Sequence, residues 1–249
     1  MKKKRILFTL IFIVSLLLVY ELKCTNLWND TKEEVKLKEE TKHKSKSSNQ
    51  PGITKEENDF PEVCTFVKKY NNKDIKGVLY IPDTDIQEPI VQAKDNEYYL
   101  NRDLSKNKDT RGSVFLDYRV KINAGRKNLI YSHNSSIHDV PFKELEKYYE
   151  KDFYKTHKYI YLKDEEKTYK YLIFSIYVET SDWTYTKLKF NTDEEWLKHL
   201  KYLKKNSWYD TGVNVDKTDQ ILILQTCSHH EKYKNYENKY LLVIAKRIA

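Results

Sequence analysis

Short apolar runs, rich in β-branched and aromatic residues, recur from residue 78 to the end of the chain and constrain its fold most. Turn-like residues separate most of these runs, which is typical of strands joined by short connections. The chain holds 21 Tyr but only 5 Gly and 5 Pro, a composition that favours strands with half-buried aromatic faces. The predicted strands, with residues 164–167 as a hairpin turn, are Val78–Ile81, Pro89–Gln92, Ser113–Tyr118, Leu129–His133, Tyr159–Lys163, Tyr169–Val178, Ile221–Thr226 and Tyr240–Ala245.

Three other segments have apolar residues at helical spacing. The first is Asp59–Asn72, and the second is Pro141–Lys155, which begins with the proline that is common at helix starts. The third is Asp193–Lys205, which Thr192 or Asp193 can cap. We therefore predict a mainly β domain, a closed or nearly closed barrel with helices on its outside.

The N-terminus has the pattern of a membrane segment. Residues 2–5 are Lys-Lys-Lys-Arg, and an apolar run follows from Ile6 to Tyr20. About 17 helical residues span about 25 Å, and the flanking lysines can reach both interfaces of a ~30 Å hydrocarbon core. Because a basic cluster stays in the cytoplasm, we predict a cytoplasmic tail at 1–5, a single-pass transmembrane anchor at 6–23 and an extracytoplasmic remainder. The alternative is a cleaved signal peptide, which lacks an A-x-A-like cleavage site here but also exports the chain.

Residues 24–58 are predicted to be a charged spacer, and residues 59–249 the folded domain. The spacer mixes Lys and Glu with few large apolar side chains, so it cannot bury enough surface to fold alone. The whole chain has 45 basic and 37 acidic residues, a formal net charge of +8 that suits an anionic membrane surface or an acidic wall polymer. We expect no nucleic-acid partner, because the chain has no nucleic-acid-binding motif and no basic block beyond the N-terminus.

Three cysteines, Cys24, Cys64 and Cys227, do not make a disulfide framework. A Cys24–Cys64 pair stays open, and Cys64 is otherwise interpreted as a small packed hydrophobe on the first predicted helix. Cys227 follows the apolar strand Ile221–Thr226, and the end of a rigid strand is where a side chain can meet substrate. An unpaired cysteine in an exported protein is a candidate nucleophile, although a structural cysteine at the end of a strand fits the same pattern.

His133 closes another apolar strand and is a candidate partner for the thiol. A free thiol has a pKa of about 8.5, so an imidazole that takes its proton makes it a nucleophile and can later protonate a leaving amine. Only the fold can bring the two residues together. His229 and His230 are rivals because they lie beside Cys227. We expect both in a solvated loop, and they form no recognised metal-ligand spacing, so we predict no metal site.

In combination, these stretches resemble a class B sortase over about residues 60–249. The family's cysteine follows a Thr at the end of an apolar strand, as Cys227 does in Leu224–Cys227. The family's histidine lies in an aromatic-Gly-His-Asn pattern, which is Tyr131–Asn134 in this chain. The supporting stretches, in order, are Gly77–Pro82, Pro89–Gln92, Asp95–Leu100 and Arg111–Arg119.

The resemblance implies a closed eight-stranded sortase-type β-barrel with N-terminal helices and a helix between strands 6 and 7, supplied by residues 59–72 and 193–205. It implies a cysteine transpeptidase with Cys227 as nucleophile and His133 as its partner. The thiolate attacks a Thr carbonyl in the C-terminal sorting motif of a Gram-positive surface protein and forms an acyl-thioester. An amine of peptidoglycan, or of another subunit, then resolves the thioester. This chemistry needs no metal and no cofactor.

One departure from the family concerns an arginine at the start of the last strand, which holds substrate and stabilises the oxyanion. Tyr240 takes that place in this chain, with Lys239 just before it, and Arg247 lies too far along the strand. Tyr240 can donate one hydrogen bond and Lys239 supplies a point charge, but neither reproduces a guanidinium fork. Ser132 replaces the family's Gly, and Thr226 is a candidate for the substrate groove.

The missing arginine leaves a second function open. Loss of one oxyanion donor can cost on the order of a hundredfold in rate. A non-catalytic or degenerate sortase-fold protein that binds or assembles the wall is therefore an alternative to the working enzyme. A cysteine hydrolase on another fold is a third reading, which the order of the strands would separate from the first two.

Overall fold

The computed structural model describes residues 60–181 and 183–249. The predicted cytoplasmic tail, membrane anchor and spacer (1–5, 6–23 and 24–58) lie outside these residues. Within the described ranges, none of the helices combines the length and the apolar character needed to cross a membrane.

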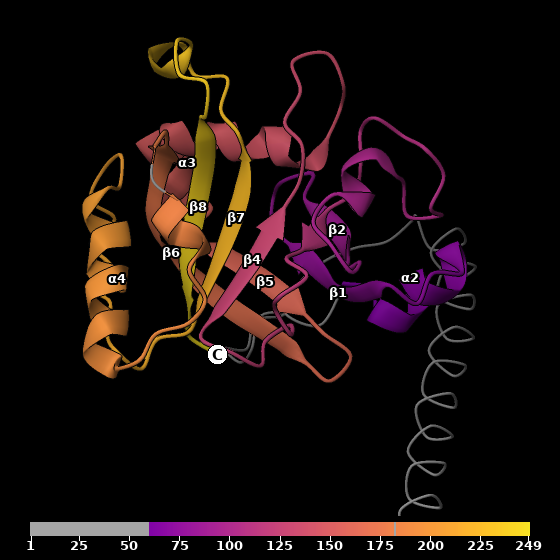
Figure 1. The fold of residues 1–249 in the computed structure, drawn as a ribbon, viewed down its shortest axis with the longest axis horizontal. Helices are drawn as coiled ribbons and strands as arrows, with labels where there is room; N and C mark the ends of the chain where they lie inside the picture. The colour runs from indigo at the N-terminus through magenta and orange to yellow at the C-terminus, as the bar shows by residue number, and fades with distance from the viewer. Residues whose placement is uncertain (1–59, 182) are drawn as a thin grey trace, which may run out of the picture. The chain divides into compact units, whose positions relative to one another are not determined.

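The described residues form a closed barrel with the strand order β1-β2-β3-β4-β7-β8-β6-β5. Figure 1 shows it from the side, with β7 between β4 and β8. Antiparallel pairing of β1 with β5 closes the barrel, while β2–β3 and β4–β7 are parallel pairs. This confirms the predicted mainly β, eight-stranded closed barrel. The strands are β1 Ile75–Tyr80, β2 Gln87–Val91, β3 Phe115–Leu116, β4 Lys127–Tyr131, β5 Tyr159–Lys163, β6 Thr168–Glu179, β7 Ile221–Cys227 and β8 Tyr240–Arg247.

The first helix and the third strand are shorter than the sequence predicted. α2 is Val63–Tyr70 rather than Asp59–Asn72, because Pro61 disfavours a helical conformation in the residue before it. β3 has only two residues, because the chain turns at Asp117, whose carbonyl accepts a hydrogen bond from the Val120 N–H (3.0 Å).

The second predicted helix divides into two elements. η3 is a 3₁₀ helix over Pro141–Tyr149, and α3 follows at Lys151–Thr156. Glu150 between them has an extended backbone (φ −87°, ψ 118°), which ends one element and begins the next. Helical spacing alone does not distinguish a continuous α-helix from this broken arrangement, since both place every third or fourth residue on one face.

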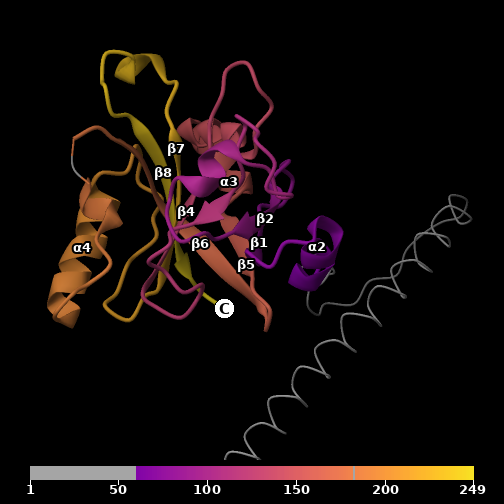
Figure 2. The same cartoon turned by 45° about the vertical axis from the view of Figure 1, so that its right-hand side comes forward.

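α4, Asp193–Lys205, has the predicted bounds and lies between β6 and β7 in the chain. The Thr192 hydroxyl caps it by accepting a hydrogen bond from the Glu195 N–H (3.1 Å). Its apolar face, with Trp196 fully buried, packs on the outer face of the barrel. α4 and α2 lie on opposite flanks of the barrel in both views (Figures 1 and 2).

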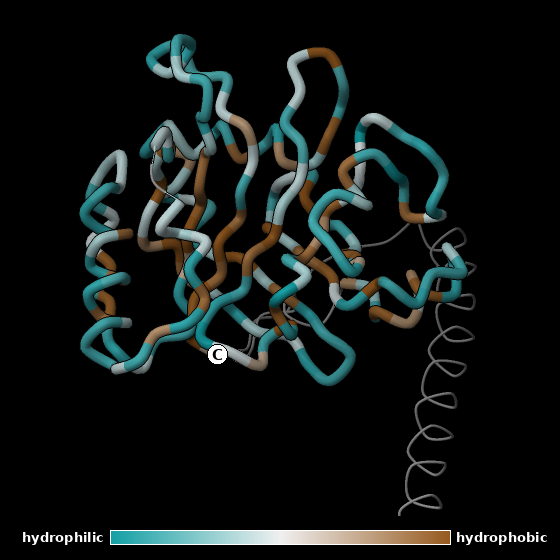
Figure 3. Tube along the Cα trace, viewed as in Figure 1, coloured by the Kyte–Doolittle hydropathy of each residue, from teal (hydrophilic) through white to brown (hydrophobic). Residues whose placement is uncertain are grey.

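The barrel strands have apolar residues on both faces, and Figure 3 shows the hydrophobic colour gathered on the central strands. Ile130, Leu222 and Leu224 belong to the cluster inside the barrel, whereas Leu129 and Ile223 belong to the cluster under α4. Successive side chains of a strand point to opposite faces. Odd-numbered residues of β4 and β7 therefore lie on the outer face, and Cys227 is one of them.

A buried lysine ties the β6–β7 connection to the sheet. This connection contains the 3₁₀ helix η4, Trp183–Thr186. Lys127, at the start of β4, is 4% exposed, and its Nζ donates hydrogen bonds to Tyr185 O (2.9 Å) and Lys187 O (2.7 Å). Its Nζ also lies 2.8 Å from His199 Nε2 on α4. Burial, with help from the charges of Arg119 and Lys187, lowers the pKa of Lys127 well below its usual value.

We predict that stability depends on pH through Lys127. Because the folded pKa is lowered, the unfolded state binds the extra proton between the lowered pKa and about 10.4, so rising pH stabilises the fold by about 1.4 kcal/mol per pH unit within that window. Lys127→Met lacks this contribution. In urea unfolding at pH 7, 8 and 9, the free energy of unfolding of the wild type minus that of Lys127→Met should therefore increase with pH. The exposed-site control Lys201→Met should follow the wild type, and a pH-independent difference for Lys127→Met would mean that the buried amine stays charged.

Candidate active site

The parallel pairing of β4 with β7 brings His133 and Cys227 to the same end of the barrel. The register pairs Tyr131 with Gln225, and each candidate lies two residues beyond its member of that pair. The loops after β4 and β7 leave the barrel next to each other at the top of Figure 1. Cys227, the last residue of β7, belongs to the outer face by the alternation of the strand, while His133 lies two residues past the end of β4.

Three hydrogen bonds hold the ends of these strands together. The Ser132 N–H donates to Gln225 O (3.2 Å), the Thr226 hydroxyl donates to Ser132 O (2.8 Å), and Asn134 Nδ2 donates to Cys227 O (2.9 Å). Thr226, the predicted groove residue, is 1% exposed and faces inward, so it braces the two strands rather than lining the outer face. Ser132 is not among the residues with positive φ, so the exchange of the family's Gly for Ser strains no backbone at this position.

The His133 ring is oriented by a backbone carbonyl. Its Nε2 lies 2.7 Å from Leu100 O, which can only accept, so Nε2 carries the hydrogen and Nδ1 of the neutral ring remains an acceptor. Gly112 makes this packing possible, because it has φ +63° and a Cβ there would lie 2.6 Å from Leu100 O and 3.0 Å from His133 Cδ2. No hydrogen bond joins His133 to Cys227 among the contacts of the described residues.

Cys227 is an exposed, free cysteine. Although the residue reaches solvent, the protein around its thiol removes enough water to raise the pKa of the thiol above its usual value. The charge of Lys239 opposes this effect without cancelling it. Lys239 is held nearby by its carbonyl, which accepts a hydrogen bond from the Ser228 N–H (2.8 Å). The thiol is therefore mostly protonated at neutral pH, and a base is needed to activate it.

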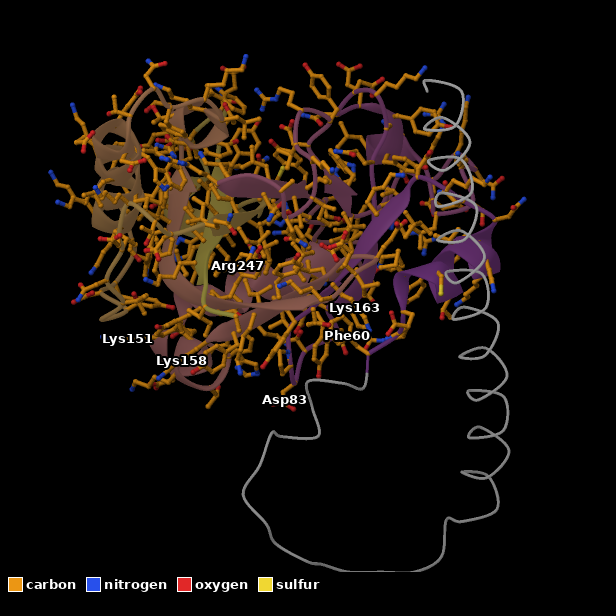
Figure 4. The ribbon with its side chains drawn as sticks, turned by 90° about the horizontal axis from the view of Figure 1, so that it is seen from below. Phe60, Asp83, Lys151, Lys158, Lys163 and Arg247 are labelled. Carbon is orange, nitrogen blue, oxygen red and sulfur yellow. The ribbon has the colours of Figure 1, made fainter. Side chains whose placement is uncertain are left out.

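Tyr240 lies directly opposite Cys227 in the antiparallel β7–β8 pair. This is the place that the sequence comparison with sortases predicted for the missing arginine. Its ring packs against Trp183 (centroids 5.0 Å apart), and its hydroxyl donates a long hydrogen bond to Asn238 Oδ1 (3.4 Å). Arg247 lies at the other end of β8, where it bonds Gln220 Oε1 (2.6 Å) and appears in the view from below (Figure 4).

Two groups around the site were not found from the sequence. Trp183 and Tyr185 come from the β6–β7 connection, and the Tyr185 hydroxyl donates to Gln225 Oε1 (2.8 Å), two residues before Cys227.

The second group lies on the other side of β4, where Tyr131 donates to the buried carboxylate of Asp117 (2.9 Å). Burial would raise the pKa of Asp117, but hydrogen bonds from Arg119, Tyr131 and Asn96 outweigh it and lower the pKa. The sortase-like stretches Asp95–Leu100, Arg111–Arg119 and Tyr131–Asn134 contain the members of this second group, but nothing in the sequence showed that they meet.

The two histidines after Cys227 have different environments. His229 is exposed, and its N–H donates to Glu146 Oε1 (2.6 Å), as expected for a loop residue. His230 is half-buried instead, and its ring packs against Tyr149 and Trp208 (centroids 4.7 and 5.1 Å apart). The prediction of a solvated residue was therefore wrong for His230, because the sequence does not show which aromatic residues approach this loop. Residues 60–181 and 183–249 contain no group of three or more His, Cys, Asp or Glu side chains placed to hold a metal.

Cys64 differs from Cys227 in both burial and chemistry. It lies buried on α2, as predicted for a packed residue, but it is disulfide-bonded. Cys227 is thus the thiol available for chemistry in the described part of the chain.

Comparison with known proteins identifies the family. The sequence model of the Sortase domain matches residues 79–248, which include both candidate residues and the strands that carry them. The chain belongs to the sortase family. Sortases are cysteine transpeptidases, so this chain is an enzyme of that type, and a cysteine hydrolase on another fold is excluded.

The relatives are class B, which confirms the predicted class. Sortase B of Listeria monocytogenes is 35% identical over 179 residues (72% of this chain, 71% of the relative), and sortase B of Staphylococcus aureus is 31% identical over 178 residues (71% of each). A Staphylococcus aureus sortase B–substrate complex has a TM-score of 0.67 at 30% identity, covering 75% of this chain and 84% of that one. A sortase B complexed with triglycine has a TM-score of 0.66 at 31% identity, covering 73% and 83%.

We predict that Lys239 tunes the thiol of this sortase. Lys239→Gln removes the charge that lowers the pKa of Cys227, so the pKa should rise further. The rate of alkylation of Cys227 by iodoacetamide, followed by mass spectrometry from pH 7 to 10.5, should then rise at higher pH in the variant. Lys234→Gln, which changes another lysine of the same loop, is the matched control and should leave the profile unchanged. Identical profiles for Lys239→Gln and the wild type would show that Lys239 does not act on the thiol.

Proposed function

We propose that this sortase cleaves a C-terminal sorting motif of surface proteins after Thr and transfers them to an amine of peptidoglycan or of another subunit. The observation that carries the proposal is the pair of neighbouring strand ends, which put an exposed free thiol and an oriented imidazole at the same end of the barrel. The substrate complex and the triglycine complex of related sortases B support a peptide donor and an amine acceptor.

In the first half-reaction, His133 Nδ1 accepts the thiol proton of Cys227. The thiolate attacks the Thr carbonyl carbon and forms a tetrahedral intermediate. The imidazolium then gives its proton to the amide nitrogen, the C–N bond breaks, and the downstream peptide leaves as an amine. An acyl-thioester on Cys227 remains.

In the second half-reaction, the acceptor amine attacks the thioester carbonyl. His133 Nδ1 takes the proton that the amine loses, the C–S bond breaks, and the thiolate of Cys227 is protonated again. A new amide joins the surface protein to the acceptor. Neither half-reaction consumes a cofactor or needs a metal ion.

The proposed location follows from the chain before the domain. An anchor at residues 6–23 with its basic cluster inside would hold the domain on the outer side of the cell membrane as a single-pass protein. The spacer at residues 24–58 would separate the domain from the lipid. Both substrates, a surface protein and the wall, are found on that side of the membrane.

Tyr240 and Lys239 are proposed to take the role of the family's arginine. Tyr240 is placed opposite the thiol, where its hydroxyl can donate one hydrogen bond to the oxyanion that forms on the Thr carbonyl. Lys239 supplies a positive charge close enough to lower the pKa of Cys227. This arrangement offers one donor and one point charge in place of a guanidinium fork.

The covalent intermediate provides the main test. We expect the full-length protein, incubated with a panel of sortase sorting peptides, to form an acyl adduct on Cys227 that mass spectrometry detects and triglycine removes. Cys227→Ala should form no adduct, and His133→Gln should lower the rate by roughly a hundredfold or more because general acid–base catalysis is lost. His230→Gln is the matched control and should keep most of the activity. If no peptide of the panel yields an adduct, the proposed reaction is wrong.

A second prediction tests whether the Tyr240 hydroxyl stabilises the oxyanion. Tyr240→Phe should lower kcat by about ten- to a hundredfold with little change in KM, since one oxyanion donor is removed. Tyr240→Arg should restore or exceed the wild-type kcat. Tyr236→Phe, in the connection just before β8 and half exposed, is the control and should be neutral. An unchanged kcat in Tyr240→Phe would remove this residue from the oxyanion site.

The missing arginine suggested an alternative from the sequence, a degenerate sortase-fold protein that binds or assembles the wall without catalysis, and an experiment in cells tests it against the proposed function. The two functions differ in their need for the thiol. In cells, Cys227→Ala should abolish attachment of surface proteins if the chain is a working transpeptidase. Unchanged attachment in that variant would favour the alternative.

A further inference from the structure

A groove on the outer face reaches Trp183, whose ring packs against Tyr240, and has no part in the two half-reactions. It has a volume of about 840 Å³ and runs between the β3–β4 connection and the β6–β7 connection. We name it the basic groove, because none of its described lining residues is acidic. Its cationic lining residues are Arg119, Lys121, Arg126, Lys187 and Lys189.

The cations of the basic groove are only partly neutralised. Three of them form ion pairs with carboxylates outside the lining, and Lys127 is buried beneath the groove. Lys121 and Lys189 are exposed and form no ion pair within residues 60–181 and 183–249. Lys121 also borders a second hollow, which is lined by the acidic hairpin 164–166. Lys189 does not line that hollow, so of these two lysines it is the one whose charge is directed to the basic groove. The groove therefore presents positive charge to an anionic ligand.

One end of the basic groove lies next to the thiol. Trp183, half exposed, lines the groove and packs against Tyr240, which is paired with Cys227. At the other end lies Arg126, whose carbonyl accepts a hydrogen bond from the Ile221 N–H (2.8 Å). At about 3.3 Å per residue, the six steps of β7 from Ile221 to Cys227 span about 20 Å. An extended peptide covers that distance with about six residues.

We infer that the basic groove binds an acidic segment of the protein substrate on one flank of the sorting motif. This inference rests on the proposed function. Carboxylates about three to six residues from the scissile bond reach the exposed cations, since the groove begins beside the thiol and ends about 20 Å away. Because the groove leaves the thiol in one direction only, the opposite flank cannot enter it. General attraction to the basic protein would act on both flanks alike.

The test uses the full-length protein in detergent micelles and peptides that share one cleaved motif. Three Glu, three Gln or three Lys residues are placed about four residues from the scissile bond, upstream in one series and downstream in the other. We expect Glu to raise kcat/KM at least about threefold over Gln on one flank only, and Lys to lower it there by a similar factor. The double variant Lys121→Glu/Lys189→Glu should lose the preference. Lys73→Glu/Lys201→Glu, which has the same net charge and lies outside the groove, should keep it.

Binding without turnover separates this inference from the proposed function. Fluorescence anisotropy of the labelled peptides on the Cys227→Ala variant should show the same one-flank preference for Glu. Cleavage of the Gln peptides with no effect of flanking charge would overturn the inference and leave the proposed function standing. If no peptide is cleaved, the proposed function fails, and the anisotropy measurement alone decides whether the basic groove binds acidic segments. Equal effects of charge on both flanks would also overturn the inference, because they would assign the effect to the net charge of the protein.

Discussion

The parallel pairing of β4 with β7 is the contact on which the site depends. Parallel strands end at the same edge of a sheet, so the residues that follow them are neighbours without any special loop. β5, β6 and α4 lie between these two strands in the chain, yet the closed strand order places β4 and β7 next to each other. An antiparallel pair would have put the imidazole and the thiol at opposite ends of the barrel.

The alternation of side chains along each strand then determines which reactive groups are exposed to solvent. Leu222 and Leu224 of β7 fill the barrel, while Cys227, three residues past Leu224, belongs to the outer face and is exposed. A register shift of one residue would move the thiol into the apolar interior. The Thr226 hydroxyl, donated to Ser132 O, and the Asn134 amide, donated to Cys227 O, oppose such a shift at the strand ends themselves.

The surroundings of the thiol differ from those implied by the family pattern. Tyr240 is opposite Cys227, and the charge that acts on the thiol comes from Lys239. The protein surface beside the thiol comes from the β6–β7 connection. The buried amine of Lys127 holds this connection through hydrogen bonds to the carbonyls of Tyr185 and Lys187. Since an unpaired buried amine is costly, these bonds give the connection a defined place on the sheet. As a result, Trp183 belongs both to the surroundings of the thiol and to the lining of the basic groove.

The sequence by itself determined the β-rich class of the domain, most strand positions, the bounds of α4 and the two residues at the strand ends. These follow from local periodicity and capping, which depend on residues close in the chain. Only the tertiary structure decided the parallel register of β4 and β7, the break at Glu150, the inward side chain of Thr226 and the aromatic packing of His230. Each of these depends on residues far apart in the chain, and local spacing carries no information about which of them meet.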